Sequence, residues 1–383
     1  MTLGKHPPAG CRVLHVLGRM VRGGAELRTL EVIRQLAPQG IICDVLALSG
    51  LPGELDSEVA HCGGRVILLA RHWGWQRRLC RVLRLGNYSA VHSHVHHFSG
   101  WILRVAYQAG VPVRVAQFHS LEDGKGDRLL RRAYRWRAQS LIDHYATAVL
   151  GVSRSVLDSN WPNHRTDHRC QVLYNGVDLP SFSSAVPREE VRKTLFGVNQ
   201  AEVKVVIHVG NLTAPKNHAM ILRIFTVLAH QRQDAHLLLV GRGDQPSEVE
   251  LRHQIAAHPH AARIHFLGSR SDVPALLLAA DVFLFPSLRE GLPGALIEAC
   301  AAGLPCLASD IAPCSEVAEL IPLVECMSLD YPAEAWSEKL SNKLAENRRL
   351  SPSEAGHLVT AAGFDVIRSS ESYAALWRGL NAR

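Results

Sequence analysis

The chain has 383 residues, of which 47 % are hydrophobic and 20 % are charged. This length exceeds one ordinary core of roughly 100 to 200 residues, so two domains are expected, and the composition excludes disorder for most of the chain. The net charge of +7 is uneven: residues 1–180 carry 23 Lys and Arg against 13 Asp and Glu, and residues 181–383 carry 19 against 22, so an anionic partner should meet the first half.

The sequence shows neither a membrane-spanning segment nor a cysteine pattern typical of disulfides or zinc sites. No run of about 18 uncharged apolar residues occurs, and the first apolar run, residues 13–17, lies between Arg12 and Arg19 without a small-residue cleavage site. The nine cysteines include no C-x-x-C pair, which argues against a disulfide framework and against a zinc knuckle. We therefore expect a cytoplasmic protein with reduced thiols.

The first half alternates short apolar runs with helical periodicity, such as Leu27, Leu30, Ile33 and Leu36. This alternation predicts crossover units that build a parallel sheet. The predicted strands are residues 12–17, 41–48, 66–70, 90–93, 113–118 and 148–152. Ligands of such sheets bind beyond the carboxyl ends of the strands, so the loops there are the places to search for function.

The loop after the first strand contains Gly23 and Gly24, followed by Ala25 and Glu26. Paired glycines before a helix let backbone amides approach a phosphate or a sugar, although a plain tight turn explains them equally well. The loop lacks G-x-G-x-x-G, which counts against a dinucleotide-dependent oxidoreductase.

Histidines follow two later strands. The run His92-Ser93-His94-Val95-His96-His97 invites a metal hypothesis, because alternate side chains of a strand share one face. No H-E-x-x-H motif or carboxylate cluster accompanies it, so no metal site is predicted. His119 ends the fifth strand, where a histidine is as often structural as catalytic.

Two basic segments of the first half contain aromatic residues. Residues 71–85 combine five Arg with Trp73 and Trp75, and residues 128–137 combine five Arg with Tyr134 and Trp136. Such helices suit an anionic membrane surface, although a solvated helix face has a similar composition. We expect peripheral attachment to the inner face of the plasma membrane through these segments. No nucleic-acid partner is expected, because they match no known reading motif.

A linker rich in Ser, Pro and Gly follows at residues 175–187, and the alternating pattern then restarts. The predicted strands of the second half are residues 204–209, 235–240, 263–267 and 281–285, each with the uninterrupted apolar core of a buried parallel strand. The expected domains are residues 1–180 and 188–363, with a C-terminal helix near residues 364–383 that packs back on the first. The expected fold is α/β, with two Rossmann-like doubly wound parallel sheets facing across a cleft.

Two loops of the second half stand out. The first follows residues 204–209 and contains Asn211 and Lys216, and a lysine at the start of a helix can neutralise a diphosphate leaving group. The second is the segment 287–298, in which Pro293 suits the first turn of a helix and Gly291 and Gly294 leave bare backbone, so the amides there could hold a phosphate. Glu290 precedes these residues. Glu298 follows about one turn into the helix, where its carboxylate can accept hydrogen bonds from ribose hydroxyls.

Segment 290–298 resembles the E-x7-E motif of the family 4 retaining glycosyltransferases, which have the GT-B fold. The flanking residues 285–287 and 299–305 extend this resemblance, and four further motifs follow the family's order along nearly the whole chain. They are the Gly23-Gly24-Ala25-Glu26 loop and residues 114–120, 174–178 and 210–217.

The resemblance implies a role for each matched residue. Gly23 and Gly24 would approach the donor and acceptor, and His119 would contact the transferred sugar. Lys216 would stabilise the departing diphosphate. Glu290 would face the sugar, the amides of residues 291–294 would hold sugar and phosphate, and Glu298 would bind ribose.

One position departs from the family pattern. Many relatives have Arg where this chain has Asn211, which leaves Lys216 alone on the diphosphate, and Arg22 or Arg289 are candidates for the missing charge. The sequence contains no D-x-D, the carboxylate pair that holds a divalent ion in many metal-dependent glycosyltransferases. We therefore expect no metal and no cofactor.

The resulting function hypothesis is a retaining glycosyltransferase of envelope or exopolysaccharide biosynthesis. It would move a sugar from a nucleoside-diphosphate sugar, UDP rather than GDP, to a glycan or lipid-linked acceptor. The alternatives are a GT-B-fold nucleotide-sugar epimerase and a non-catalytic protein that binds an anionic membrane or nucleic acid. The sequence leaves the sugar, the base and the acceptor open.

Overall fold

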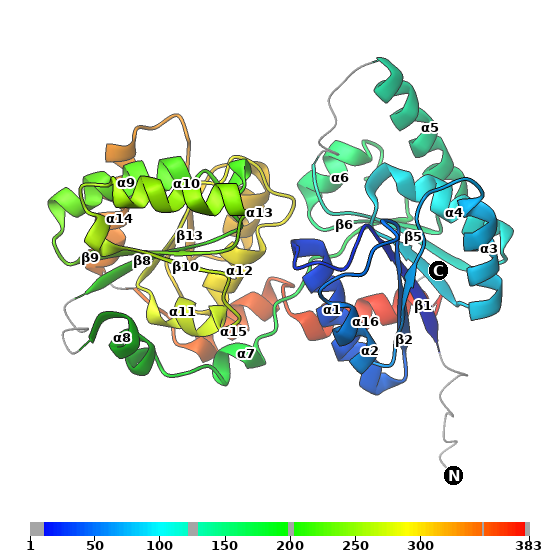
Figure 1. Ribbon diagram of the computed structural model, residues 1–383, viewed down its shortest axis with the longest axis horizontal. Coiled ribbons are helices and arrows are strands. Elements are labelled where there is room, and N and C mark those ends of the chain that lie inside the picture. The colour runs from blue at the N-terminus through cyan, green and yellow to red at the C-terminus, as the bar shows by residue number, and fades with distance from the viewer. Residues whose placement is uncertain (1–10, 122–128, 198–202, 347, 380–383) are drawn as a thin grey trace, which may run out of the picture. The chain divides into compact units, whose positions relative to one another are not determined.

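The computed structural model describes residues 11–121, 129–197, 203–346 and 348–379. The chain forms two compact units (Figure 1). Unit 1 comprises Met1–Gly176 and Val366–Arg383, and unit 2 comprises Val177–Asp365. The chain therefore returns to unit 1 for its last helix.

Unit 1 is built around a seven-stranded sheet whose strands all pair in parallel. The strands are β1 (Arg12–Leu17), β2 (Ile42–Ala47), β3 (Val66–Leu68), β4 (Ala90–Ser93), β5 (Val113–Phe118), β6 (Ala148–Gly151) and β7 (Cys170–Val172). The helices are α1 (Gly24–Leu36), α2 (Asp56–His61), α3 (Trp75–Gly86), α4 (Ser99–Gln108), α5 (Leu129–Tyr145), α6 (Arg154–Asn160) and α16 (Val366–Trp377). Short 3₁₀ turns lie at Ala37–Gln39 and His96–Phe98.

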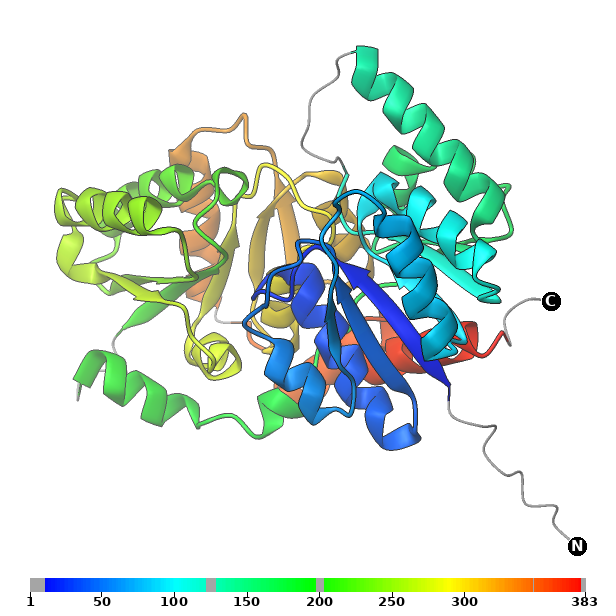
Figure 2. The same cartoon turned by 45° about the vertical axis from the view of Figure 1, so that its right-hand side comes forward.

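The strand order of unit 1 is β3-β2-β1-β4-β5-β6-β7, so the order reverses between β1 and β4. In open α/β sheets, ligands bind beyond the carboxyl ends of the strands at such a switch point. Helix α16 packs along α1 on one face of this sheet, as Figures 1 and 2 both show. Tyr373 and Trp377 of α16 are buried in the same core as Leu30 and Ile33 of α1. The last helix thus completes the hydrophobic core of unit 1.

Unit 2 has a six-stranded parallel sheet. Its strands are β8 (Lys204–Val209), β9 (Ala235–Val240), β10 (Ile264–Gly268), β11 (Val282–Phe285), β12 (Cys306–Ser309) and β13 (Val324–Met327). Its helices are α7 (Pro180–Ser183), α8 (Arg188–Phe196), α9 (His218–Gln231), α10 (Gln245–Ala256), α11 (Val273–Ala279), α12 (Gly294–Ala301), α13 (Ala312–Leu320), α14 (Ala333–Glu346) and α15 (Pro352–Ala361). In the described part of this unit, 3₁₀ turns lie at Ala214–Lys216 and Ala261–Arg263.

The strand order of unit 2 is β10-β9-β8-β11-β12-β13, which reverses between β8 and β11. The same reversal thus occurs in both units. Helices α9 and α14 pack together beside this sheet, and Phe225 of α9 and Trp336 of α14 are buried in its core. The switch point of unit 2 is where the loops after residues 209 and 285 emerge.

Every strand predicted from the sequence is present, with ends that differ by at most two residues. Strands β7, β12 and β13 were not predicted, and the predicted linker at residues 175–187 contains the short helix α7. Among the described residues, no helix is both long and apolar enough to cross a membrane.

Candidate functional site

The switch point of unit 2 brings together two residues that lie 74 positions apart in the sequence. Lys216 ends the 3₁₀ turn after β8, and Glu290 lies in the loop after β11. The Lys216 Nζ lies 2.6 Å from the Glu290 Oε1, and the two side chains are only 19 % and 11 % exposed. The two motifs that the sequence singled out separately therefore form one charged pair.

Several contacts hold Lys216 in this position. Its Nζ lies 4.8 Å from the centroid of the Phe285 ring, within the range of a cation–π interaction. A Cβ on Gly210 would come within 2.9 Å of the His208 Nε2 and 3.1 Å of the Lys216 side chain, so the glycine lets both side chains lie close to the strand end. The Leu288 backbone N–H also donates to the Pro215 carbonyl over 2.8 Å. The loops that carry the pair are thus tied together.

Neutral histidines surround this charged pair. Burial and, as a smaller cause, the nearby Lys216 ammonium lower the pKa of His218 to about 4. Burial also lowers the pKa of His208, whose Nδ1 lies 2.9 Å from the Leu284 carbonyl oxygen. Neither imidazole competes with Lys216 as a cation near neutral pH, so Lys216 supplies positive charge beside two uncharged rings.

Helix α12 begins directly after the loop that carries Glu290. Its first residue is Gly294 and Pro293 is its N-cap, so the prediction that Pro293 lies in the first turn is wrong by one residue. Glu298 lies four residues into this helix and is partly buried, as are Gly291 and Leu292. Asn211 lies in the loop after β8 and is exposed. These positions surround the same carboxyl-end edge of the sheet as Lys216 and Glu290.

In unit 1, the paired glycines behave differently from each other. Gly23 is the N-cap of α1, and the Glu26 carboxylate folds back over it, so a side chain at position 23 would require the end of the Glu26 side chain to move. Gly24 is the first residue of α1, and a Cβ placed on it would have no protein atom within 4 Å. Rigid packing among the described residues therefore requires glycine at neither position, and only at position 23 would a side chain displace a neighbour.

The sequence did not single out Glu26 by itself. Burial raises the pKa of its carboxyl group, although a backbone hydrogen bond opposes the shift. Glu26 lines a pocket of about 590 Å³ in unit 1, a volume within the usual range for small-molecule sites. Arg19, Arg71 and Arg131 line the same pocket, together with His96 and His97 of the histidine run. A largely basic pocket therefore lies beside the paired glycines.

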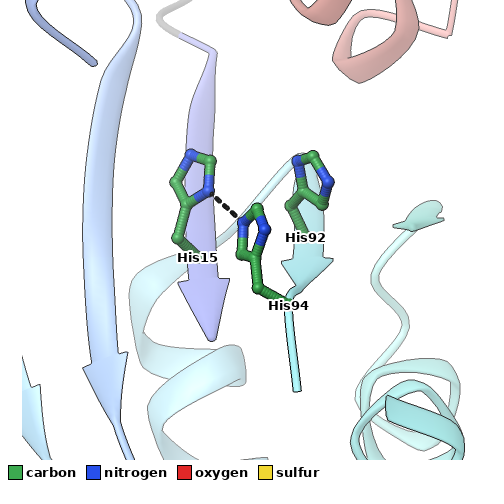
Figure 3. A group of neighbouring side chains, drawn as sticks. All are labelled: His15, His92 and His94. Carbon is green, nitrogen blue, oxygen red and sulfur yellow. Dashed lines mark hydrogen bonds between the residues drawn. The ribbon is translucent and has the colours of Figure 1, made fainter. Parts of the chain in front are cut away.

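His119 follows β5 and is part of a line of histidines. Its Nε2 lies 2.8 Å from the Nδ1 of His94, and the Nε2 of His94 lies 3.0 Å from the Nδ1 of His15 (Figure 3 shows the second contact). Burial lowers the pKa of His119 to about 4 and that of His15 to about 3. His15 was not identified from the sequence, because a single histidine inside an apolar strand carries no local signal.

The histidine run is thus divided between two places. His92 and His94 point into the interior beside His15, and one nitrogen of each of these three rings lies within 4.8 Å of the others (Figure 3). Among the described residues this is the group whose spacing suits a metal ion. His96 and His97 form the next 3₁₀ turn and line the basic pocket instead.

The basic segments lie on helices that share a side of unit 1. Helix α4 packs against both α3 and α5, which carry most of the arginines in question, as Figure 2 shows. Trp73 is 97 % exposed and Trp136 is 70 % exposed, and Leu85, Leu129 and Leu130 are also exposed. Arg128 lies outside the described residues.

Arg22 was a candidate for the charge that Asn211 does not supply. Its guanidinium lies 3.9 Å from a carboxylate oxygen of Glu58 and 4.0 Å from one of Glu54. Its side chain thus has acidic neighbours within unit 1. A cation that the sequence analysis overlooked is Arg242, which follows β9 and whose carbonyl accepts a hydrogen bond from the Leu212 N–H over 2.8 Å.

Two family models match the chain. Residues 22–180 match the model described as Glycosyltransferase Family 4, and residues 203–342 match the model described as Glycosyl transferases group 1. The two matches fall on the two sheets, and they include the Gly23–Gly24 loop, His119, Lys216, Glu290 and Glu298.

Curated relatives and a solved structure agree with these matches. A Bacillus subtilis (strain 168) chain with the proposed name glycosyltransferase EpsF is 31 % identical over 349 residues, which cover 88 % of each chain. The Escherichia coli UDP-Gal:alpha-D-GlcNAc-diphosphoundecaprenol alpha-1,3-galactosyltransferase is 26 % identical over 245 residues, which cover 61 % of this chain and 60 % of that one. The crystal structure of Anabaena Alr3699/HepE in complex with UDP has a TM-score of 0.78 at 17 % identity and covers 96 % of this chain and 98 % of its own.

Proposed function

The chain belongs to glycosyltransferase family 4, and we propose that it transfers a sugar from a UDP-sugar to a hydroxyl of a glycan or lipid-linked acceptor. The proposed setting is envelope or exopolysaccharide biosynthesis. The fold is GT-B, with two Rossmann-like parallel sheets. The observation that carries the proposal is the Lys216–Glu290 pair at the switch point of unit 2, where this topology binds ligands.

Lys216 is proposed to stabilise the departing diphosphate. Negative charge accumulates on the β-phosphate as the bond to the sugar breaks, and a fixed ammonium in a mostly buried site opposes that charge strongly. In the absence of a ligand, Glu290 neutralises this ammonium over 2.6 Å. This ion pair holds the lysine in place before the donor arrives, and a bound diphosphate would then share Lys216 with Glu290.

Glu290 and Glu298 are proposed to contact the two ends of one donor. Glu290 faces the transferred sugar, and Glu298, one turn into α12, accepts hydrogen bonds from the ribose hydroxyls. The backbone of Gly291, Leu292, Pro293 and Gly294 lies between them at the start of α12, where amide groups favour a phosphate. In this arrangement the two carboxylates are not an acid and base pair.

The proposed reaction retains anomeric configuration and needs no metal ion. The sequence has no D-x-D, and Lys216 together with the start of α12 supplies the positive potential that a cation would give. Retention rests on family membership. It fits a same-side displacement in which an oxygen of the leaving phosphate takes the proton of the acceptor hydroxyl.

UDP is proposed as the nucleotide, and a lipid diphosphate as one acceptor class. A related structure contains UDP, and the name of the Escherichia coli relative specifies a UDP-sugar donor and a diphosphoundecaprenol-linked sugar. The pocket lined by Arg19, Arg71 and Arg131 suits an anionic acceptor. Glu26, whose pKa burial raises, would meet a sugar hydroxyl there.

Thermal shift measurements test the donor assignment. UDP should raise the melting temperature in the presence of EDTA, and GDP should do so less, because a ligand that binds only the folded chain stabilises it. Transfer from a UDP-sugar, followed by NMR of the product, then reports the anomeric configuration. An inverted product would overturn the proposed retention, and no response to any nucleoside diphosphate would overturn the donor site.

Peripheral membrane attachment through α3 and α5 is proposed from their exposed arginines and the exposed Trp73 and Trp136. Anionic vesicles at low salt should sediment the chain, and neutral vesicles should not. Replacing Arg77, Arg78 and Arg81 together by Gln should reduce sedimentation, whereas replacing the exposed Arg348 of unit 2 should not. Equal sedimentation with both kinds of vesicle would contradict an electrostatic attachment.

A further inference from the structure

The three histidines of unit 1 form a straight hydrogen-bonded chain across the switch point. His15 lies on β1, His94 directly follows β4 and His119 directly follows β5, which are neighbouring strands. The ring centroids of His15 and His94 are 5.3 Å apart and their facing nitrogens 3.0 Å; for His94 and His119 the values are 5.1 Å and 2.8 Å. In both contacts the separation of the centroids exceeds that of the nitrogens by the same amount, which is twice the distance from the centre of an imidazole ring to one of its nitrogens. This is possible only when both nitrogens lie on the line that joins the two centroids, so each pair of nitrogens meets head-on.

This chain consists of neutral rings. Burial lowers the pKa of His15 to about 3 and of His119 to about 4, and it lowers the pKa of His94 well below its usual value. A neutral imidazole has one N–H and one lone pair. His94 uses both of its nitrogens in the chain, so its two contacts must run in the same direction. The whole chain therefore has only two proton arrangements.

In the first arrangement the protons point inward, and the last N–H is on His15 Nε2. This atom is buried and has no hydrogen-bond partner among the described residues. The Trp377 indole meets the His15 ring edge-on, with centroids 5.2 Å apart, and its N–H, which can only donate, is also buried without an acceptor there. Inward protons would thus leave two buried donors at one small cavity that both rings line.

The Gln117 side-chain oxygen also lines this cavity and, like both ring nitrogens of His92, has no hydrogen-bond partner among the described residues. The Gln117 amide nitrogen donates to the Tyr373 hydroxyl over 2.7 Å. Within the histidine chain itself, the complement of the Trp377 N–H is a lone pair on His15 Nε2, because the indole meets the His15 ring edge-on.

In the second arrangement the protons point outward, and the cavity then receives one donor and one acceptor from the two rings in place of two donors. His15 Nε2 carries a lone pair at the cavity that the Trp377 indole also lines, His15 Nδ1–H donates to His94, and His94 Nδ1–H donates to His119 Nε2. The remaining nitrogen of His119, Nδ1, must then carry its proton.

We infer that His94 and His15 fix the tautomer of His119, so that its Nδ1–H donates a hydrogen bond to an oxygen of the transferred sugar. The inference rests on the proposed function only for the identity of that ligand. His119 is then a hydrogen-bond donor and not a general base. His94 and His15 are positioning residues that act through it.

A metal ion at His15, His92 and His94 is the competing account, since one nitrogen of each ring lies within 4.8 Å of the others. A cation that binds two imidazoles at about 2.0 Å needs their lone pairs to converge on it. Here the facing nitrogens point at each other, and the second nitrogen of His94 is occupied by His119. The residues that line the cavity include no carboxylate to balance a divalent charge.

NMR of the full chain with ¹⁵N-labelled histidine tests the tautomer without any substrate. The signals of His119 are assigned by their loss in His119→Asn. The expected result is a protonated-type Nδ1 and a pyridine-type Nε2. A pyridine-type Nδ1 overturns the inference, as does stoichiometric metal in the purified chain.

Two variants cut the chain at different points. His94→Phe removes the partner of His119, and His15→Phe breaks the chain one bond further away; both should shift the His119 nitrogen signals toward the other tautomer. The matched control is His92→Phe, equally buried and stacked on His94 at 4.3 Å but outside the chain, which should leave them unchanged. Unchanged His119 signals in both chain variants would overturn the inference. If either variant does not fold, the tautomer measured in the wild type is the test.

Kinetics then connect the tautomer to transfer. His94→Phe should lower kcat about tenfold with little change in donor KM, since the lost donor acts mainly in the transition state. His94→Asn should restore most of the rate, because its amide N–H can replace the Nδ1–H that His94 donates. Equal rates for the Phe and Asn variants would overturn the positioning role. If the chain transfers no sugar at all, the proposed function fails while the NMR result still decides the tautomer.

Discussion

The two units share one strand order but differ in the electrostatics of their switch points. In unit 1 the point between β1 and β4 carries neutral histidines, and burial keeps their pKa values low. In unit 2 the point between β8 and β11 carries the Lys216–Glu290 ion pair at 2.6 Å. The topology thus determines where a ligand binds, and the side chains at that edge determine which chemistry follows.

The difference fits two chemical demands of the proposed reaction. A diphosphate gains negative charge as it leaves, so the proposed site needs a cation, and in the structure Glu290 pairs with that cation. A sugar is uncharged, so its site needs directed hydrogen-bond donors and acceptors. The following predictions test whether the charge of Lys216 matters at the switch point of unit 2 and the neutrality of the histidines at that of unit 1.

The largest expected effect follows the loss of the cation. Lys216→Ala should lower kcat about 10² to 10³-fold, because one preorganised group opposite a developing charge contributes on that order. Steady-state transfer from the UDP-sugar measures it. Lys193→Ala, on the exposed face of α8 in the same unit, is the control and should leave kcat within twofold. A similar kcat for both variants would contradict the role given to Lys216.

The two glutamates of segment 290–298 should differ in kind. Glu298→Ala should raise the donor KM about tenfold with little change in kcat, because ribose binding is the same in the ground and transition states. Glu290→Ala should lower kcat as well, because Glu290 is proposed to contact the reacting sugar and its loss removes the ion pair with Lys216. Full steady-state curves against UDP-sugar separate the two. Equal and negligible effects would show that neither carboxylate meets the donor.

Gly24→Ala separates packing from binding in unit 1. A Cβ there meets no protein atom within 4 Å, and the residue lies in α1, so the melting temperature should stay the same or rise slightly. If the ligand approaches this backbone, the acceptor KM should rise severalfold. In Gly23→Ala the new side chain would displace only the end of the flexible Glu26 side chain, so the melting temperature should also change little. A Gly24→Ala enzyme with normal KM would remove Gly24 from the site.

The smallest expected effect is on stability against pH. The folded pKa of His15, about 3, is below the value near 6.5 of an unfolded chain, so the unfolded state binds more protons between these pH values. Stability from this group is complete above pH 6.5 and falls as the pH drops toward 3. Calorimetry should therefore show a lower melting temperature at pH 5 than at pH 7.

The control for this prediction removes the titrating group. In His15→Phe, the decrease in melting temperature from pH 7 to pH 5 should be smaller than in the wild type by a few °C. Replacing the exposed His72 by Phe should leave the decrease as it is in the wild type. The same pH dependence in His15→Phe and in the wild type would mean that His15 is not held neutral by burial.

The sequence predicted the strands well where apolar runs are buried and uninterrupted. It missed β7, a strand of three residues at the sheet edge whose central Gln171 is exposed, and β13, which is half-buried at the other sheet's edge. It also missed β12, which is buried but contains Cys306 and Ser309, residues with little strand preference. Strands at edges or with small polar residues lack the hydrophobic signal on which the prediction rests.

The site was predictable in its parts and not in its contacts. Lys216 and Glu290 were both expected from their motifs, but no local pattern joins residues 74 positions apart. The run of histidines suggested at most a metal, because only the folded sheet shows that His94 lies between His15 and His119. Arg22 was proposed for the diphosphate from its position alone, and the structure gives it acidic neighbours at Glu54 and Glu58.

The most direct test of the central claim is calorimetric titration of UDP into the chain in the presence of EDTA, with the wild type and Lys216→Ala compared. The account predicts that UDP binds the wild type without metal and that Lys216→Ala binds it at least tenfold more weakly. Binding that EDTA abolishes, or an equal affinity in the two chains, would contradict a donor site whose charge is supplied by Lys216.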